Sequence, residues 1–193
     1  MELQHINVKL IVSDPAAVDL ERLVPIFHGW IQEQSREELL LDVADYRHVP
    51  GGPGVILIGH EANYSVDDTN HRLGVRYNRK AAVAGTNQGR LAQAARAALA
   101  ACQALETDPS LDGKLRFNGQ EIEISMNDRL IAPNNAATRQ ALEPEFSAFF
   151  RKLFAGSVHG LAFDNGDARR LFGVLARSSR IFTTGELLKN LNA

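Results

Sequence analysis

The sequence predicts an α+β protein: a mostly antiparallel mixed sheet built from hairpins and a meander, with helices packed on it as a two-layer sandwich. Two observations predict this class. Several short stretches alternate apolar and polar residues across turn-forming residues, as strands do, and other segments repeat apolar residues at the spacing of a helix face. The 193 residues, 45% of them hydrophobic, suffice to bury a core without disulfides or metals, so we expect a single domain over residues 1–193.

The amino-terminal part is predicted to form a strand followed by a broken helix. In residues 3–12, apolar residues alternate with Asn7 and Lys9, which is the period of a half-buried strand. Asp14-Pro15 then combines a helix-capping residue with a proline at the first helical position. The apolar residues that follow lie on one helical face, and Pro25 inside that pattern predicts a kink or two short helices.

The next stretch is predicted to be an antiparallel meander. Strand-like segments over residues 38–49, 55–64 and 72–78 are separated by the turn signals of residues 50–54 and of the polar residues 67–70. Three strands joined by such short turns pair with their neighbours in antiparallel order.

The second half is predicted to contain two helices and one clear hairpin. Residues 87–106 are rich in alanine, and the small side chains of their inner face would let this helix lie close to a sheet. Asn118-Gly119 between two apolar runs is the dipeptide that a tight hairpin turn prefers. Phenylalanines at helical spacing over residues 146–154 predict the second helix, with Gly156 as its stop.

The carboxyl-terminal part leaves one alternative open. Residues 157–180 fit either a hairpin that turns at Asn165-Gly166 or a short helix that begins at Asp167. The last helix is marked by a capping box, in which Thr183 and Glu186 precede an apolar face.

Charge and hydropathy exclude several classes of protein. A formal net charge of -2 argues against a dedicated nucleic-acid-binding domain, which is usually strongly basic. The amino terminus lacks the pattern of a signal peptide, and no apolar run approaches the roughly 18 residues of a membrane helix. Cys102 is the single cysteine, so no intramolecular disulfide can form. We therefore expect a cytoplasmic protein without membrane or nucleic-acid partners.

The most distinctive feature is that acidic and basic residues are separated along the chain. From residue 69 to residue 105 there is no Asp or Glu, whereas residues 31–68 are mostly acidic in their charges. Mixed charges that only keep a surface soluble are not distributed in this way. The basic residues of the acid-free run are Arg72, Arg76, Arg79, Lys80, Arg90 and Arg96.

The acid-free run suggests a site for an anionic ligand. On a strand, Arg76, Asn78 and Lys80 would share one face, because side chains alternate between the two faces. A helix is expected to begin within residues 85–89, and its first N–H groups favour a carboxylate or a phosphate. Arginine adds paired donors that suit the same groups. The candidate anion-binding residues are therefore Arg76, Asn78, Arg79, Lys80 and Arg90.

Two other interpretations of the same charges stay open. The basic and acidic segments could be neighbouring strands whose side chains pair across one sheet. They could also face each other across a symmetric homodimer. The glycines of residues 85–89 match neither a phosphate-binding loop nor a dinucleotide fingerprint. The leading hypothesis is thus a non-catalytic binding or interaction domain, which uses residues 72–96 for an anionic ligand, a partner or self-association.

The alternative hypothesis is an enzyme with a metal site or an acid–base site. His48, His60, Glu61 and His71 would supply imidazole and carboxylate groups if the meander brought them to one rim of the sheet. The same groups could transfer protons, since histidine titrates near neutral pH. The sequence has no histidine pair at helical spacing and no Cys-x-x-Cys, and no motif identifies a cofactor or a reaction.

Overall fold

The computed structural model describes residues 1–163 and 166–193 and has the predicted α+β architecture. The strands are β1 (Ile6–Val12), β2 (Leu40–Tyr46), β3 (Gly54–Gly59), β4 (Ala62–Asp67), β5 (Gly74–Arg79), β6 (Phe117–Met126), β7 (His159–Phe163) and β8 (Gly173–Ser178). The long helices are α1 (Leu23–Glu33), α2 (Asn87–Thr107), α3 (Ala136–Leu153) and α4 (Thr184–Asn192). Short 3-10 helices are η1 (Pro15–Ala17), η2 (Leu20–Arg22), η3 (Thr69–His71) and η4 (Pro109–Leu111). None of the helices described is both long and apolar enough to span a membrane.

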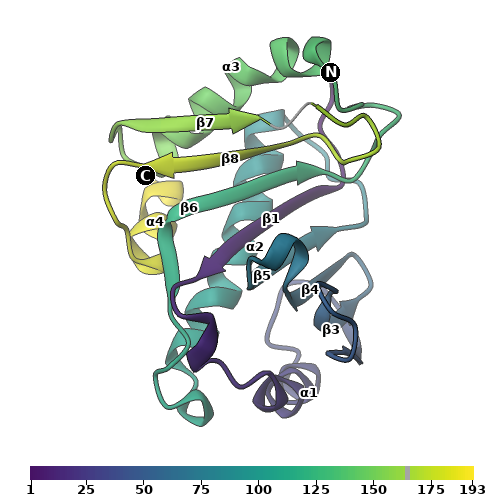
Figure 1. Ribbon diagram of the computed structural model, residues 1–193, viewed down its shortest axis with the longest axis vertical. Helices are drawn as coiled ribbons and strands as arrows, with labels where there is room; N and C mark the ends of the chain where they lie inside the picture. Colours follow the sequence, from purple (N-terminus) through teal and green to yellow (C-terminus); the bar gives the residue numbers. More distant parts are fainter. Residues whose placement is uncertain (164–165) are drawn as a thin grey trace.

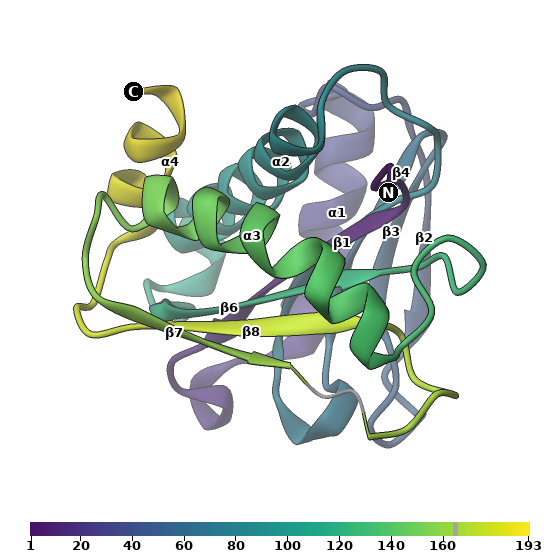
Figure 2. The same ribbon diagram turned by 90° about the horizontal axis from the view of Figure 1, so that it is seen from above.

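The strands form one open antiparallel sheet. Within the described residues the sheet has eight strands in the order β2-β3-β4-β5-β1-β6-β8-β7. Figures 1 and 2 show α2, α3 and α4 on one side of this sheet, with α1 beside them over the β2 end. The opposite side of β1, β6 and β8 is left without a covering α-helix in the described part of the chain. β1 lies near the middle of the sheet. Because the described α-helices cover one side of the sheet there, the two faces of β1 have different surroundings.

The core lies between the sheet and the helices. α2 packs along β1 and β5, and the small-residue face predicted for it is buried. α3 contributes the predicted row of phenylalanines, of which Phe146 packs on Phe172 and Phe154 on Phe182. The apolar periodicity of both helices therefore identified the side that meets the sheet.

Helix starts follow the capping residues that the sequence marks. Thr86 and Asn135 each accept a hydrogen bond from the N–H three residues further on, at the starts of α2 and α3. The capping box predicted for α4 has both of its hydrogen bonds. Pro25 lies in the first turn of α1, where the backbone N–H has no partner within the helix, so the proline does not break α1. The short helices η1 and η2 precede α1.

The strand predicted over residues 55–64 is wrong, because two strands occupy this region. β3 ends at Gly59 and β4 begins at Ala62, so the meander has four strands and turns at His60-Glu61. A Cβ on Gly59 would lie 2.5 Å from the Ala62 carbonyl oxygen, so only glycine permits this tight approach. The turn has none of the Asn-Gly or Pro-Gly dipeptides that announce turns in a sequence.

The hairpin predicted at Asn118-Gly119 is also wrong. β6 runs through both residues, and a shift of register opposite Leu10 and Ile11 absorbs the irregularity. A Cβ on Gly119 would lie 2.0 Å from the Phe182 carbonyl oxygen. Glycine at this position therefore serves a close contact between backbones and not a turn.

The hairpin interpretation of residues 157–180 is confirmed. β7 pairs with β8 in antiparallel order, and residues 167–170 form turns where a short helix was the alternative. Of the predicted turn dipeptide Asn165-Gly166, the asparagine lies outside the described residues.

One polar cluster is buried on the helix side of the sheet. Glu38, which is 4% exposed, accepts hydrogen bonds from the hydroxyls of Tyr64 at 2.7 Å and Tyr77 at 2.8 Å. Gln93 of α2 donates to the Tyr77 oxygen at 3.0 Å. Each hydroxyl in this cluster has a partner, as buried polar groups require. Burial raises the pKa of Tyr77 to about 12, and it raises the pKa of Tyr64 further in the same direction.

These shifted tyrosines predict a loss of stability in alkali. Above about pH 10 the unfolded chain releases phenolic protons that the folded chain still holds. The free energy of unfolding should then fall with rising pH, by up to about 1.4 kcal/mol per pH unit for each tyrosine. Urea denaturation of the wild type and Tyr77→Phe at about pH 9 to 11 measures the slope. In Tyr77→Phe the free energy of unfolding should fall less steeply with pH, because one of the two tyrosines no longer contributes. The same slope in both proteins would contradict the raised pKa of Tyr77.

Candidate anion-binding site

The central strand β1 is buried on both faces, and not half-buried as its alternating pattern predicted. Val8 and Leu10 belong to the apolar core on the helix side. Asn7 and Lys9 point to the other side, yet they are only 6% and 2% exposed. Polar side chains of neighbouring strands and three connecting segments surround them. The side of the sheet without α-helices is therefore a hollowed polar surface.

This hollow is a groove with a volume of about 770 Å³. Its floor comes from β5, β1, β6 and β8, and its rim from the segments that join β4 to β5 and β6 to α3 and from residues 169–171, which precede β8. Among the described residues that line the groove, Glu123 is the single acidic side chain. The basic side chains that line it are Lys9, Arg72, Arg76, Arg129, Arg169 and Arg170.

Lys9 and Arg76 share one carboxylate at the centre of the floor. The two residues are directly opposite each other on β1 and β5, and Asp67 lies at the end of the next strand, β4. The Lys9 ammonium donates to one oxygen of Asp67, and the Arg76 guanidinium lies 2.9 Å from the other. Gly74 makes room for this contact, because a Cβ there would lie 2.9 Å from Lys9 Cε. One carboxylate thus balances two cations.

Burial sets the electrostatics of this group. Asp67 is 1% exposed and Lys9 2%, whereas Arg76 is 26% exposed and is the member that faces the groove most openly. Burial lowers the pKa of the Lys9 ammonium below its ordinary value, and the Asp67 carboxylate offsets only part of that effect. Because Asp67 holds the Arg76 guanidinium in place, that guanidinium is already ordered before any ligand arrives.

A neutral hydrogen-bonding stretch follows along the floor. Asn7 donates to the Ser125 hydroxyl at 3.4 Å, and Asn78 donates to the Asn7 side-chain oxygen. On the rim, Arg170 lies 3.4 Å from the side-chain oxygen of Asn70, which connects the β7–β8 segment with the β4–β5 segment. Amides and hydroxyls in such a position can donate to and accept from the same ligand.

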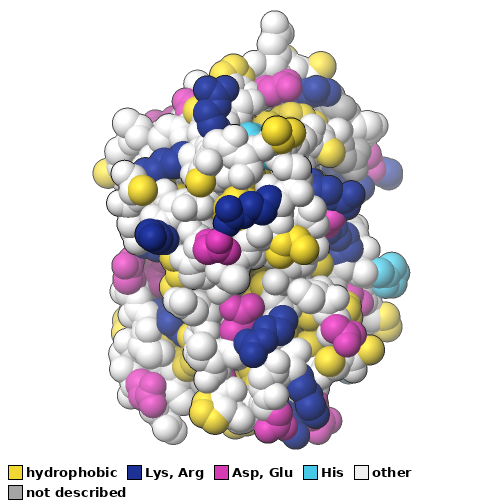
Figure 3. All heavy atoms as spheres, turned by 90° about the vertical axis from the view of Figure 1, so that its left-hand side faces the viewer, with side chains coloured by type: hydrophobic (Ala, Val, Ile, Leu, Met, Phe, Trp, Pro, Cys, Tyr) yellow, Lys and Arg dark blue, Asp and Glu magenta, His cyan; other side chains and the backbone are white. Residues whose placement is uncertain are grey.

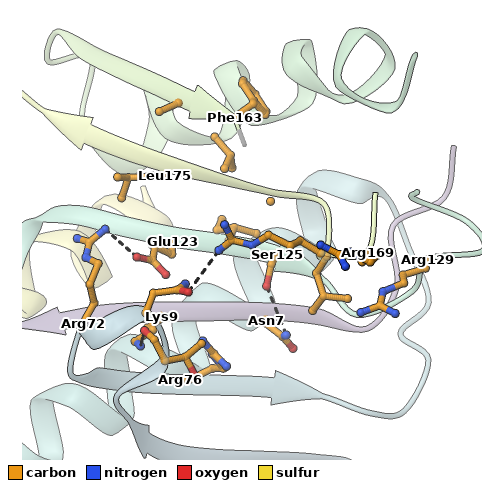
Figure 4. A pocket seen from close by; sticks show the side chains of 18 residues that line it. Asn7, Lys9, Arg72, Arg76, Glu123, Ser125, Arg129, Phe163, Arg169 and Leu175 are labelled. Atoms are coloured by element: carbon orange, nitrogen blue, oxygen red, sulfur yellow. Dashed lines mark hydrogen bonds and ion pairs between the residues drawn. The ribbon is translucent and has the colours of Figure 1, made fainter. Parts of the chain in front are cut away.

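The arginines are placed in order along the groove. Figure 4 shows Arg72 at one end, Lys9 and Arg76 next, then Asn7 and Ser125, and Arg129 with Arg169 at the other end. At the first end, Arg72 pairs with Glu121 and, at 2.8 Å, with Glu123.

At the other end, Arg169 pairs with Asp167 at 3.0 Å, and hydrogen bonds from Arg169 lower the pKa of the Asp167 carboxyl. Arg129 forms no hydrogen bond or ion pair within the described part of the chain. Within the described residues, Lys9, Arg72, Arg76 and Arg169 each have an ion pair, which Arg129 lacks.

Apart from Arg170, the described charges of the groove fall into three groups. Lys9 and Arg76 against Asp67 leave one positive charge near the centre of the floor. Arg129 and Arg169 against Asp167 leave another at the open end. Arg72 and Arg177 both contact Glu121, and Arg72 also contacts Glu123, so these two cations are balanced by two carboxylates. Apart from Arg170, the described side chains of the groove and their partners therefore carry an excess of two positive charges, in a chain of net charge -2.

The five residues predicted to bind an anion do not form one site. Arg76 lines the groove and Asn78 lies beside Asn7 on the same face. The other three face elsewhere and contact other groups: Arg79 the Ala81 carbonyl, Lys80 the Gly59 carbonyl, and Arg90 the Val83 carbonyl and Glu2. Backbone carbonyl oxygens satisfy charges that the sequence pattern assigned to a ligand.

The residues of the metal hypothesis are not brought together either. His60 and Glu61 form the β3–β4 turn, whereas His48 and His71 follow β2 and β4 at the opposite end of these strands. A strand of six residues separates the two ends by about 20 Å. Among the described residues, no group of three His, Cys, Asp or Glu side chains could hold a metal ion.

The cross-strand interpretation of the charges holds between the neighbouring strands β4 and β5, and one further arginine lies near an acidic residue that precedes β2. Arg76 of β5 pairs with Asp67 of β4, and Arg79 lies 3.8 Å from Glu38. Figure 3 shows one side of the molecule, where basic and acidic side chains are interspersed. The separation of charges along the sequence is thus partly cancelled in the folded protein.

Several residues of the groove were not predicted as site residues. Arg129 and the pair Arg169-Arg170 lie in connecting segments far from the acid-free run, and Glu123 and Ser125 lie in and just after the second apolar run of the predicted hairpin. One signal was present, because a lysine stands in the middle of the apolar strand β1. A buried lysine needs a partner, so its presence pointed to a polar surface beneath the sheet.

Comparisons with known proteins add no relative. No family model matches this chain, and no curated protein or solved structure matches it.

Proposed function

We propose that this protein binds a small anionic ligand in the groove on the side of the sheet without α-helices. The observation that carries the proposal is the excess of two positive charges among the described residues of one groove, with Arg170 not counted, on a chain whose net charge is negative. Fixed guanidinium groups in a recess favour carboxylates and phosphates, because they donate paired hydrogen bonds without losing much side-chain freedom.

A small molecule fits this groove better than a macromolecule. The charges of the floor are recessed, since Lys9 is 2% exposed and Arg76 26%, so a flat surface or a duplex could not reach them. Nucleic-acid binding uses many exposed cations over a wide surface, which a chain of net charge -2 does not offer. A volume of about 770 Å³ is in the range of ordinary ligand pockets.

Replacement of Arg76 tests the proposal. Calorimetric titration with citrate and with fructose bisphosphate should show binding to the wild type that weakens as salt is raised. Arg76→Gln should weaken it by at least about tenfold, since a hydrogen bond to a charged group contributes about 1.5–3 kcal/mol.

Arg79→Gln is the matched control, because Arg79 belongs to the same strand but contacts Ala81 and Glu38 away from the groove. The control should bind as the wild type does once circular dichroism confirms that both variants are folded. Binding that is unchanged in Arg76→Gln, or lost equally in both variants, would contradict the proposal.

A further inference from the structure

The two excess charges of the groove lie at separate places. One belongs to Lys9 and Arg76, which share Asp67, and the other to Arg129 and Arg169 beside Asp167. On β6, Glu123 lies opposite Lys9, and the strand ends three positions further on at Met126, after which the chain leads to Arg129. Three strand residues span about 10 Å. Arg129 lies beyond that end of the strand, so a ligand that meets both charges carries an anionic group at each of two separated positions.

The space between the two charges is lined on one side by neutral polar groups. Asn7 and Ser125 lie on the floor there (Figure 4). Asn70 also lines the groove, and its side-chain oxygen lies 3.4 Å from the Arg170 guanidinium. An amide and a hydroxyl both donate and accept, so they match hydroxyl groups, which do the same. A purely apolar chain would leave these groups without partners, which is costly once water is displaced.

The opposite side of the groove is apolar. Ala162 and Leu175 are neighbours on β7 and β8 and line the groove beside the polar floor. A sugar chain has hydroxyl groups that suit the floor and C–H groups that suit this wall.

From this arrangement we infer that the ligand is a hydroxylated carbon chain with an anionic group at each end, of the class of sugar acid phosphates and sugar bisphosphates. The inference rests on the proposed anion-binding function and adds the class of ligand. The phosphate is assigned to Arg129 and Arg169, since guanidinium groups match phosphate geometry and a doubly charged group loses less hydration at the open end. The second anionic group is assigned to Arg76 and Lys9.

Titration with compounds that differ in one feature tests the class. Phosphogluconate has both anionic ends and the hydroxyl groups, and fructose bisphosphate has a phosphate at each end. Gluconate and glucose phosphate each lack one anionic end, and adipate has both charges without hydroxyl groups. Phosphogluconate and fructose bisphosphate should bind at least about tenfold more tightly than the other three. Their relative affinity distinguishes a carboxylate from a phosphate at the Arg76 end.

A variant at the open end tests the placement. Arg129→Gln should lower the affinity for phosphogluconate by at least about fivefold. It should leave the affinity for gluconate within about twofold of the wild-type value, because gluconate has no phosphate to bind at that end. Lys114→Gln, an exposed cation in a loop that does not line the groove, is the matched control and should change neither affinity.

The outcomes separate this inference from the proposed function. Adipate or citrate binding as tightly as phosphogluconate would overturn the inference, while a loss of that binding in Arg76→Gln would keep the proposed function. Equal weakening of gluconate and phosphogluconate by Arg129→Gln would also overturn the placement of the phosphate. No binding of any compound would overturn both.

Discussion

Asp67→Asn should lower the free energy of unfolding by about 3–5 kcal/mol, the usual cost of removing one partner of a buried ion pair. Asp67 and Lys9 are 1% and 2% exposed, and Asp67 is the carboxylate that contacts the Lys9 ammonium. Asparagine keeps the shape of the side chain without its charge, so the lysine is left buried without a counterion. Urea denaturation of the variant and the wild type near neutral pH measures the difference.

The same variant should have a distinctive dependence on pH. Burial already lowers the pKa of Lys9 in the wild type, and the Asp67 carboxylate opposes that effect. Without the carboxylate the pKa of Lys9 falls further, and the folded variant releases a proton that the unfolded chain keeps. Because the unfolded state then binds more protons, stability rises with pH, and the deficit should be smaller at about pH 9 than at about pH 6.

Two further variants distinguish the buried ion pair from a general effect of charge. Asp68→Asn removes the adjacent carboxylate, which is 43% exposed, and should change the stability by less than about 1 kcal/mol. Lys9→Met combined with Asp67→Leu replaces both charges by apolar groups and should recover most of the loss. A double variant as unstable as Asp67→Asn alone would contradict the ion-pair explanation.

Gly74→Ala should destabilise the folded protein by about 3 kcal/mol, although it adds a single methyl group. The added Cβ would lie 2.3 Å from the Leu10 carbonyl oxygen and 2.9 Å from Lys9 Cε. A backbone oxygen of the central strand cannot move aside as the tip of a side chain can, so β5 would have to separate from β1. The Lys9 side chain would also lose its path across β5 to Asp67.

Gly160→Ala provides the control for this prediction. Gly160 also lies in a strand, β7 at the edge of the sheet, but a Cβ there meets no atom within 4 Å. This variant should stay within about 0.5 kcal/mol of the wild type in the same denaturation measurement. If the two alanine variants were equally stable, the close approach of β5 and β1 at Gly74 would not be limiting.

The helices and the fold class were predictable because their signals are local. Apolar residues at helical spacing and the capping residues Thr86, Asn135 and Thr183 lie within the segments that they organise. Neither signal depends on a distant part of the chain. For the same reason the side of α2 and α3 that meets the sheet could be identified from sequence.

The two errors in the strands have a common cause. Gly59 stands at a turn without a recognisable turn dipeptide, while Gly119 follows an asparagine as in a turn but lies inside a strand. In both cases the glycine is required by a neighbouring backbone, the Ala62 carbonyl in one and the Phe182 carbonyl in the other. The second of these neighbours lies 63 positions further along the chain, so no local pattern contains it.

The candidate site was predictable only in part. The acid-free run correctly pointed to Arg76 as a residue of the groove. It also pointed to Arg79 and Lys80, but Arg79 lies on the opposite face of β5 and Lys80 lies beyond the end of that strand. What makes Arg76 part of a groove is the register of three strands, which places Lys9 between it and Glu123. Register depends on the packing of the whole sheet, and a shift by one residue would turn all these side chains to the other side.

The sequence by itself determined an α+β fold, the helices with their caps, and an unusual separation of charge along the chain. Only the tertiary structure decided which of those charges remain unbalanced. Carboxylates and carbonyl oxygens from distant segments neutralise most of the basic run, whereas Lys9 and Arg76 must share Asp67, and Arg129 forms no hydrogen bond or ion pair in the described residues. The physical reason is that an ion pair depends on distance in space, and the order of strands in the sheet sets that distance.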